Sequence, residues 1–179
     1  GDHRDLHSFP TRALPILEMS SREELIYMSK ICEQTERFED MVNQMKKVVQ
    51  MGAELSVEER NLLSVAYKNT LGPRRTAWRV LSSIEQKEEA KGSKNLNLLR
   101  EYKIKIENEL KEYCNDILNL LDQNLITSAG NSEAKVFFLK MKGDYYRYIS
   151  EFATGETHNK ASENALSSYK QATEIGNAE

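Results

Sequence analysis

Apolar residues recur every three to four positions along the chain from Met19 onward. This spacing is typical of the buried face of an α-helix, and no segment alternates as a β-strand does. The apolar positions predict six helices, at 25–32, 38–49, 62–84, 98–121, 136–149 and 165–175. Consecutive helices joined by short loops lie antiparallel. The pattern therefore predicts an all-α fold, built as an antiparallel array of about six helices.

Small and polar residues mark where several of these helices begin and end. Ser21 with Glu24, and Ser56 with Glu59, have the spacing of capping boxes at helix N-termini. Gly52 is expected to end the second helix, because glycine readily adopts the left-handed conformation found at helix C-termini. Four connections are then expected: a tight turn at Thr35–Arg37, a charged linker at Gln86–Asn95, and polar loops at Thr127–Ser132 and Gly155–Asn159.

The third predicted helix contains the pair Gly72-Pro73. A proline inside a helix removes one backbone hydrogen bond and clashes with the carbonyl four residues earlier, here that of Asn69. Because the apolar period resumes after Arg75, we expect a kink in this helix and not its end.

The first 18 residues differ in character from the rest of the chain. They contain two of the three histidines, show no apolar period and lack an initiator methionine, whereas Met19 reads like a natural start. We therefore expect a non-native or disordered leader at 1–18 and one domain at 19–179.

Composition and charge exclude several classes of protein. The 179 residues include 25 Lys and Arg against 28 Asp and Glu, which gives a net charge of −3. A general nucleic-acid binder usually carries a strong basic excess, so no nucleic-acid partner is expected. No apolar run approaches the roughly 20 residues that span a bilayer, so no membrane partner is expected either. Two cysteines cannot build a disulfide framework, and a reducing compartment is the default.

Residues typical of enzyme active sites are scarce. His3, His7 and His158 are expected in loops or in the leader, with no partner at metal-ligand spacing. Cys32 and Cys114 lie within apolar helical periods and are interpreted as buried, inert thiols. No glycine-rich phosphate loop is present. The sequence therefore predicts a protein that is not an enzyme, with no catalytic residue, no metal site and no cofactor.

Two predicted helices carry charged faces. The third helix has a basic face formed by Lys68, Arg75 and Arg79. The fifth helix has a mixed face formed by Lys140, Asp144, Arg147 and Tyr148. Two antiparallel helices that turn these faces together would suit a phosphate dianion, because arginine forms forked, charge-assisted bonds to phosphate. The alternative is a solvated face with ordinary ion pairs one helical turn apart.

Several runs strongly resemble the signature of the 14-3-3 family. They are Val57–Asn69, Arg74-Arg75 followed by Trp78-Arg79, Ser82–Lys87, Lys135–Phe137 and Leu139–Tyr148. Glu151–Gly155 looks similar to the epsilon-like branch. The resemblance implies an all-α dimer that binds phosphoserine or phosphothreonine motifs and acts as an adaptor and regulator. It implies phosphorylated client proteins and other 14-3-3 subunits as partners, and a cytoplasmic location with the nucleus as a second compartment.

The resemblance also implies roles for individual residues. The phosphate would be bound by Lys68, Arg75, Arg147 and Tyr148. The surrounding groove would be lined by Asn61, Val65, Arg79, Lys140 and Lys142. Glu151 would help to position a phosphate-binding arginine. The dimer would pair Arg37 with Glu109, Asp40 with Lys105 and Glu24 with Lys94, and its apolar contact would include Ile31 and Tyr102.

This sequence also departs from the family pattern. Family members continue for further helices that complete the groove, so the chain is expected to be an N-terminal fragment with weakened phosphopeptide binding. The alternative is a helical dimerisation fragment without productive binding. Pro73 replaces the usual alanine, and a kink there would disturb the approach of Arg75. Ala77 replaces a serine whose phosphorylation, in some members, weakens the dimer.

Overall fold

The computed structural model describes residues 21–178, so the expected leader at 1–18 lies outside the described residues. The described part is all-α and contains no strand. Its helices are α2 (Arg22–Gln34), α3 (Phe38–Gln50), α4 (Val57–Lys91), α5 (Leu96–Leu120), the π-helical turn η1 (Leu121–Leu125), α6 (Ser132–Phe152) and α7 (Gly155–Asn177). The prediction of six helices is confirmed, with η1 as a continuation of α5 that periodicity did not reveal. None of the described helices is long and apolar enough to cross a membrane.

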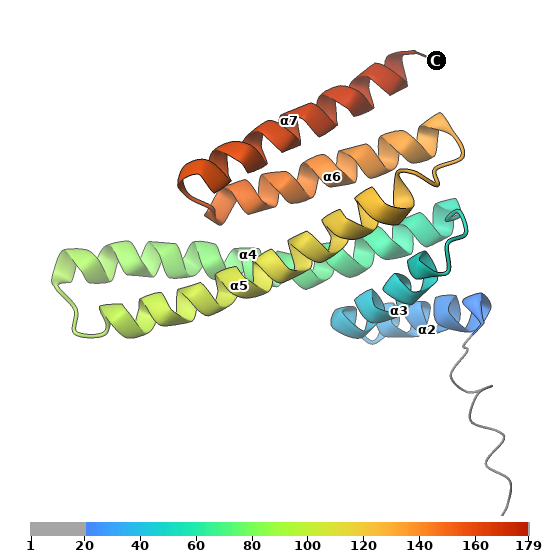
Figure 1. Ribbon diagram of the computed structural model, residues 1–179. Helices are drawn as coiled ribbons and strands as arrows, with labels where there is room; N and C mark the ends of the chain where they lie inside the picture. The colour runs from blue at the N-terminus through green and yellow to red at the C-terminus, as the bar shows by residue number, and fades with distance from the viewer. Residues whose placement is uncertain (1–20, 179) are drawn as a thin grey trace, which may run out of the picture.

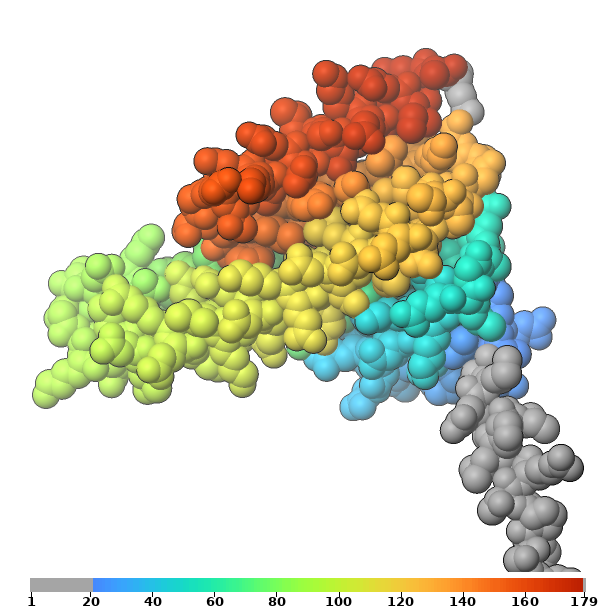
Figure 2. All heavy atoms as spheres, viewed as in Figure 1, coloured from blue at the N-terminus to red at the C-terminus, as the bar shows by residue number. Residues whose placement is uncertain are grey.

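Each helix packs mainly against its neighbours in the chain (Figure 1). The long helices α4 and α5 lie antiparallel and form an arm that extends to the left of the view. The α2–α3 hairpin packs near the start of α4. On the opposite side α6 packs against α5, and α7 lies on the outer side of α6. The space-filling view shows the arm projecting beyond both hairpins (Figure 2).

The core lies where α3, α4, α5 and α6 meet. Its fully buried side chains include Met41, Met45, Leu63, Leu71, Leu110 and Ile117. Tyr67 is also fully buried, and its hydroxyl donates a hydrogen bond of 2.6 Å to Asp116. The second carboxylate oxygen of Asp116 lies 2.7 Å from the Lys46 ammonium group. Every polar atom of this network thus has a partner, as buried polar groups require.

The predicted helix boundaries are largely confirmed. The Ser21 hydroxyl accepts a hydrogen bond from the Glu24 amide, and Ser56 and Glu59 form the reciprocal capping box. The turn between α2 and α3 falls within Thr35–Arg37, where Glu36 adopts a φ of 56°. The loop before α6 and the end of α3 are also confirmed, because α6 begins at Ser132 and Gly52, with a φ of 83°, follows α3.

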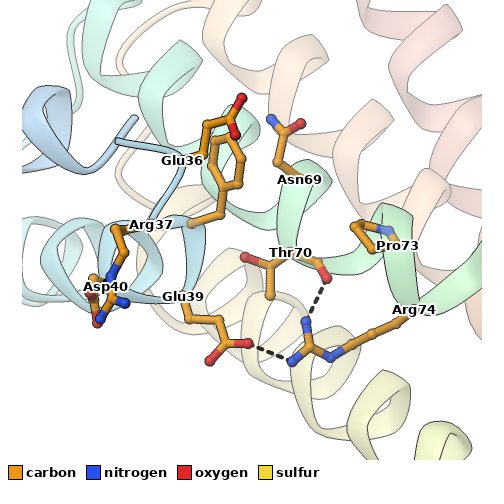
Figure 3. A pocket seen from close by; sticks show the side chains of 9 residues that line it. Glu36, Arg37, Glu39, Asp40, Asn69, Thr70, Pro73 and Arg74 are labelled. Carbon is orange, nitrogen blue, oxygen red and sulfur yellow. Dashed lines mark hydrogen bonds and ion pairs between the residues drawn. The ribbon is translucent and has the colours of Figure 1, made fainter. Parts of the chain in front are cut away.

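Helix α4 runs without interruption from Val57 to Lys91 and contains Pro73 in its interior. The prediction that the helix would continue past this proline is confirmed. Pro73 and Arg74 face the α2–α3 turn and line a cavity of about 380 Å³ there (Figure 3). Arg75, the next residue around the helix, instead pairs with Glu151 on α6.

The charged linker predicted at Gln86–Asn95 is confirmed only for Gly92–Asn95, and the prediction was wrong for the residues before Gly92. The helix continues to Lys91 and ends at Gly92, which has a left-handed φ of 65°. Glutamate, glutamine, lysine and alanine are all strong helix formers, so a run of them without large apolar residues is still compatible with an exposed helix. Glu85 also links α4 to α5, because its carboxylate lies 3.0 Å from Lys103 and 3.4 Å from Arg100 on α5.

The prediction of a loop at Gly155–Asn159 was also wrong. Helix α7 begins at Gly155, and only Ala153 and Thr154 separate it from α6. The polar residues in this stretch form the exposed first turns of a helix whose apolar residues start later. His158 therefore lies in a helix, with its ring Nδ1 2.7 Å from the carbonyl oxygen of Ser150.

Both cysteines are buried, as predicted, and they are free thiols. Burial raises the pKa of both, and it raises the pKa of Cys114 from 9.0 to about 12. At neutral pH the thiolate of Cys114 is therefore about a thousandfold scarcer than that of an ordinary cysteine.

We expect Cys114 to react with a thiol-specific dye at least about a hundredfold more slowly in the native protein than in urea, because both burial and protonation protect it. A native rate equal to the unfolded rate would contradict this. Because the native thiol holds its proton more tightly, its contribution to stability is present below about pH 9.0 and is lost as the pH rises toward about 12.

Candidate functional site

A cavity of about 280 Å³ lies between α4 and α6. It is lined by Ser64, Lys68, Phe137, Lys140, Met141, Asp144, Tyr145, Arg147 and Tyr148. Lys68 is exposed on α4, and Arg147 is half-exposed on α6. Of the basic face of α4 only Lys68 lines this cavity, whereas all four residues of the mixed face of α6 line it.

Arg75 lies beside this cavity in a fixed orientation. Its Nη2 and Nε atoms donate hydrogen bonds of 2.6 and 3.1 Å to the two carboxylate oxygens of Glu151. The carbon of its guanidinium group lies 3.8 Å from the centroid of the Tyr148 ring. Arg79, one turn further along α4, also contacts Glu151, at 3.3 Å. A forked carboxylate pair and an aromatic face together hold the plane of the Arg75 guanidinium.

Asp144 organises the opposite wall of the cavity. One of its carboxylate oxygens accepts a hydrogen bond of 3.0 Å from Lys140, which is the ion pair that a merely solvated helix face would also show. The other oxygen accepts a hydrogen bond of 2.5 Å from the hydroxyl of Tyr169 on α7. Arg147 in turn donates from Nε to the Tyr169 hydroxyl at 3.3 Å, and this bond is the largest cause of a raised Arg147 pKa.

Tyr169 is the residue at this site that the sequence analysis missed. Its place in the apolar period of α7 indicated only packing. Burial, followed by the hydrogen bond to Asp144, raises the pKa of its hydroxyl, so the group is protonated at neutral pH. Only the docking of α7 on α6 brings this hydroxyl to the cavity.

The cluster carries an excess of positive charge. It contains the basic side chains Lys68, Arg75, Arg79, Lys140 and Arg147. Two carboxylates, Asp144 and Glu151, are shared among four of them. Lys68 forms no ion pair within residues 21–178. An excess of fixed positive charge around a polar cavity attracts an anion, and arginine and lysine together suit a phosphate.

The remaining residues assigned to the groove lie near this cavity but do not line it. Asn61 is exposed on α4, one turn before Ser64, and Val65 is half-buried against the core. Lys142 points to a different partner, because its ammonium group lies 2.7 Å from Asp122 on η1. The geometry therefore assembles Lys68, Arg147 and Tyr148 more tightly than it assembles these three.

The residues expected at a dimer contact gather on α2, the start of α3 and the α4–α5 arm. Arg37, just before α3, contacts Asp40 in the first turn of that helix at 2.8 Å, and Glu109 lies 3.8 Å from Arg74. Ile31 is half-buried, and Tyr102 is 52% exposed. Four more large apolar side chains are exposed on α4 and α5, namely Val80, Ile84, Leu98 and Ile104.

The chain is similar to known proteins over most of its length. A family model described as 14-3-3 protein matches residues 28–179. The 14-3-3-like protein F of Nicotiana tabacum is 57% identical over 164 residues, which cover 89% of this chain and 64% of that protein. The 14-3-3 protein homolog of Candida albicans is 55% identical over 157 residues, covering 87% of this chain and 60% of that protein.

A more distant relative gives the same result. The 14-3-3 protein 3 of Entamoeba histolytica is 51% identical over 160 residues, covering 89% of this chain and 67% of that protein. The chain thus spans about two thirds or less of the length of the relatives it matches. The family model covers well over half of the chain, and the runs that carry the resemblance form α4 and α6, the two walls of the basic cavity. The chain belongs to the 14-3-3 family.

Proposed function

We propose that this chain binds phosphoserine- or phosphothreonine-containing segments of client proteins and acts as an adaptor and regulator. One observation carries the proposal: Lys68, Arg147 and Tyr148 line a single cavity, and Arg75 stacks on the Tyr148 ring beside it. A phosphoryl group offers strong acceptor oxygens and close to two negative charges, which match two arginine forks, a lysine and a phenolic hydroxyl. Glu151 supports this arrangement by holding Arg75.

We further propose that binding of a single short phosphopeptide is weak. The side chains of Arg147 and Lys140 are 51% and 67% exposed, so water and salt screen the charges that face the ligand. Exposed ion pairs contribute about 0–1 kcal/mol each, which is consistent with a dissociation constant weaker than about 10 μM.

Fluorescence anisotropy of a labelled phosphoserine peptide, titrated with this protein, tests the proposal. The same peptide without its phosphate is the control. We expect saturable binding of the phosphorylated peptide, weakened by added salt, and no saturation with the control peptide. Equal binding of both peptides would contradict the proposed function. A dissociation constant tighter than about 10 μM would contradict only the proposed weakness.

A second role is proposed for the exposed arm, namely dimerisation with itself or with other 14-3-3 subunits. The support is the number of large apolar side chains that α4 and α5 expose, Tyr102 among them. A surface rich in exposed large apolar side chains is typical of an interaction site. If the cavity fails to bind phosphate, a dimerisation module without productive client binding remains the alternative. We propose further that the protein acts in the cytoplasm, with the nucleus as a second compartment. We propose no nucleic-acid or membrane partner for it.

A further inference from the structure

A tyrosine of the last helix reaches into the basic cluster from outside the two helices that form the cavity. The ring of Tyr169 lies directly against the backbone of α6 at Gly143, where an added Cβ would be only 2.6 Å from a ring carbon. The absence of a side chain at position 143 therefore makes room for the ring. This close approach brings the Tyr169 hydroxyl within hydrogen-bonding distance of both Asp144 and Arg147.

The direction of the two hydrogen bonds follows from what a hydroxyl can do. A phenolic hydroxyl has one proton, and Tyr169 donates it to Asp144 at 2.5 Å. Towards Arg147 the oxygen can then only accept, and it accepts from Nε at 3.3 Å. The hydroxyl thus stands between the carboxylate and the guanidinium group. The shortest direct contact of the ion pair, from Arg147 Nη2 to Asp144 Oδ1, is 3.7 Å, which is too long for a hydrogen bond.

This arrangement leaves the outer edge of the guanidinium group of Arg147 free. The two Nη atoms form no hydrogen bond within the described part of the chain, and the Tyr148 ring supports the group at 4.9 Å. A guanidinium group whose Nη atoms form no hydrogen bond and whose plane is held can form two parallel bonds to a phosphate at low entropic cost. If Asp144 bound Arg147 directly, the carboxylate would occupy that edge.

We propose that Tyr169 is a positioning residue for the phosphate site. Its hydroxyl donates a hydrogen bond to Asp144 and accepts one from Nε of Arg147, and it thereby keeps the Nη atoms of Arg147 available to the ligand. The proposal rests on the proposed function, since it assigns the role of Tyr169 in binding the same phosphate. It makes α7 part of the recognition apparatus, although only α4 and α6 line the cavity.

The test is the variant Tyr169→Phe, which keeps the ring on Gly143 and removes only the hydroxyl. We expect its affinity for the phosphoserine peptide to fall about two- to tenfold, the effect of losing one hydrogen bond in the site. The matched control is Tyr146→Phe on α6, because the Tyr146 hydroxyl forms no hydrogen bond within residues 21–178. That variant should bind as the unaltered protein does.

A spectroscopic signal separates positioning from a general loss of structure. The Nε–Hε resonance of Arg147 in ¹⁵N NMR should shift, and its proton should exchange faster with water, in Tyr169→Phe but not in Tyr146→Phe. The inference is overturned if Tyr169→Phe binds the phosphopeptide as tightly as the unaltered protein, or if the Arg147 resonance is unchanged. If the unaltered protein does not distinguish the phosphorylated from the unphosphorylated peptide, the proposed function itself fails, and this inference with it.

Discussion

Replacing Arg75 with glutamate is expected to abolish phosphate-dependent peptide binding, with a loss of affinity of about a hundredfold or more. The variant removes one of the two arginines proposed to bind the phosphate. It also places a carboxylate where the guanidinium now lies, 2.6 Å from Glu151 and against the face of Tyr148. Two neighbouring carboxylates would repel each other and the ligand alike. The measurement is the anisotropy titration with the phosphoserine peptide.

Two further variants make this result specific. Lys111→Glu reverses an exposed charge on α5, outside the cavity, and should leave the affinity unchanged within about twofold. Arg75→Lys keeps the charge but loses the forked geometry, so an intermediate loss of about tenfold is expected. Full binding by Arg75→Glu would contradict the proposed site.

The same variant also separates the adaptor from the dimerisation module. The Arg75 side chain pairs with Glu151 on α6 and is not among the exposed apolar side chains of the arm, so Arg75→Glu should sediment as the unaltered protein does. If phosphopeptide binding is lost and self-association at micromolar concentration is retained, the two roles use different surfaces. If every sample is a monomer at that concentration, the proposed dimer contact is refuted.

Replacing Pro73 with alanine should raise the free energy of unfolding by about 2–3 kcal/mol. Pro73 lies in the interior of α4 and cannot donate a hydrogen bond to the carbonyl of Asn69. Alanine would supply that bond and remove the ring that crowds the carbonyl. Urea denaturation followed by far-ultraviolet circular dichroism measures the change, provided that the slope of the transition is the same in both proteins.

Gly72→Ala is the matched control for this experiment. An added Cβ at Gly72 would meet no atom within 4 Å, so the variant tests backbone preference alone. It should stabilise the protein by about 1 kcal/mol, less than Pro73→Ala. A destabilising effect of Pro73→Ala would show that the proline ring contributes to the α2–α3 turn and its cavity more than it costs α4.

The positions of the helices could be predicted from the sequence because apolar periodicity records which face of each helix is buried. The two wrong boundary predictions, at the end of α4 and the start of α7, have the same cause. The last turns of α4 and the first turns of α7 bury little, so no period marks them, and the charged run at Gln86–Asn95 was interpreted as a linker. There the helix is maintained by backbone preference and by contacts such as that of Glu85 with Lys103, which periodicity does not register.

The residues on each wall of the candidate site could be predicted from the sequence, but the contact from α7 could not. Spacing along one helix showed that Lys68 and Arg75, or Arg147 and Tyr148, share a face, and the resemblance indicated that the two faces meet. Neither could reveal Tyr169, because its role depends on how α7 docks on α6 and on the space left by Gly143. A hydrogen bond between separate helices leaves no regular trace in the sequence of either one.

The attachment of α7 has a consequence for the dynamics of the cavity. Within the described chain, α7 packs extensively on α6 alone and adds no residue to the core between α3, α4, α5 and α6, so it can detach without disrupting that core. Segments held by a single interface open more readily than the whole molecule unfolds. Each such excursion would withdraw Tyr169 and release Asp144 to capture Arg147. The population of molecules able to receive a phosphate would then be governed by the local opening equilibrium of one helix, so that any contact stabilising α7 would act as a remote activator of the site.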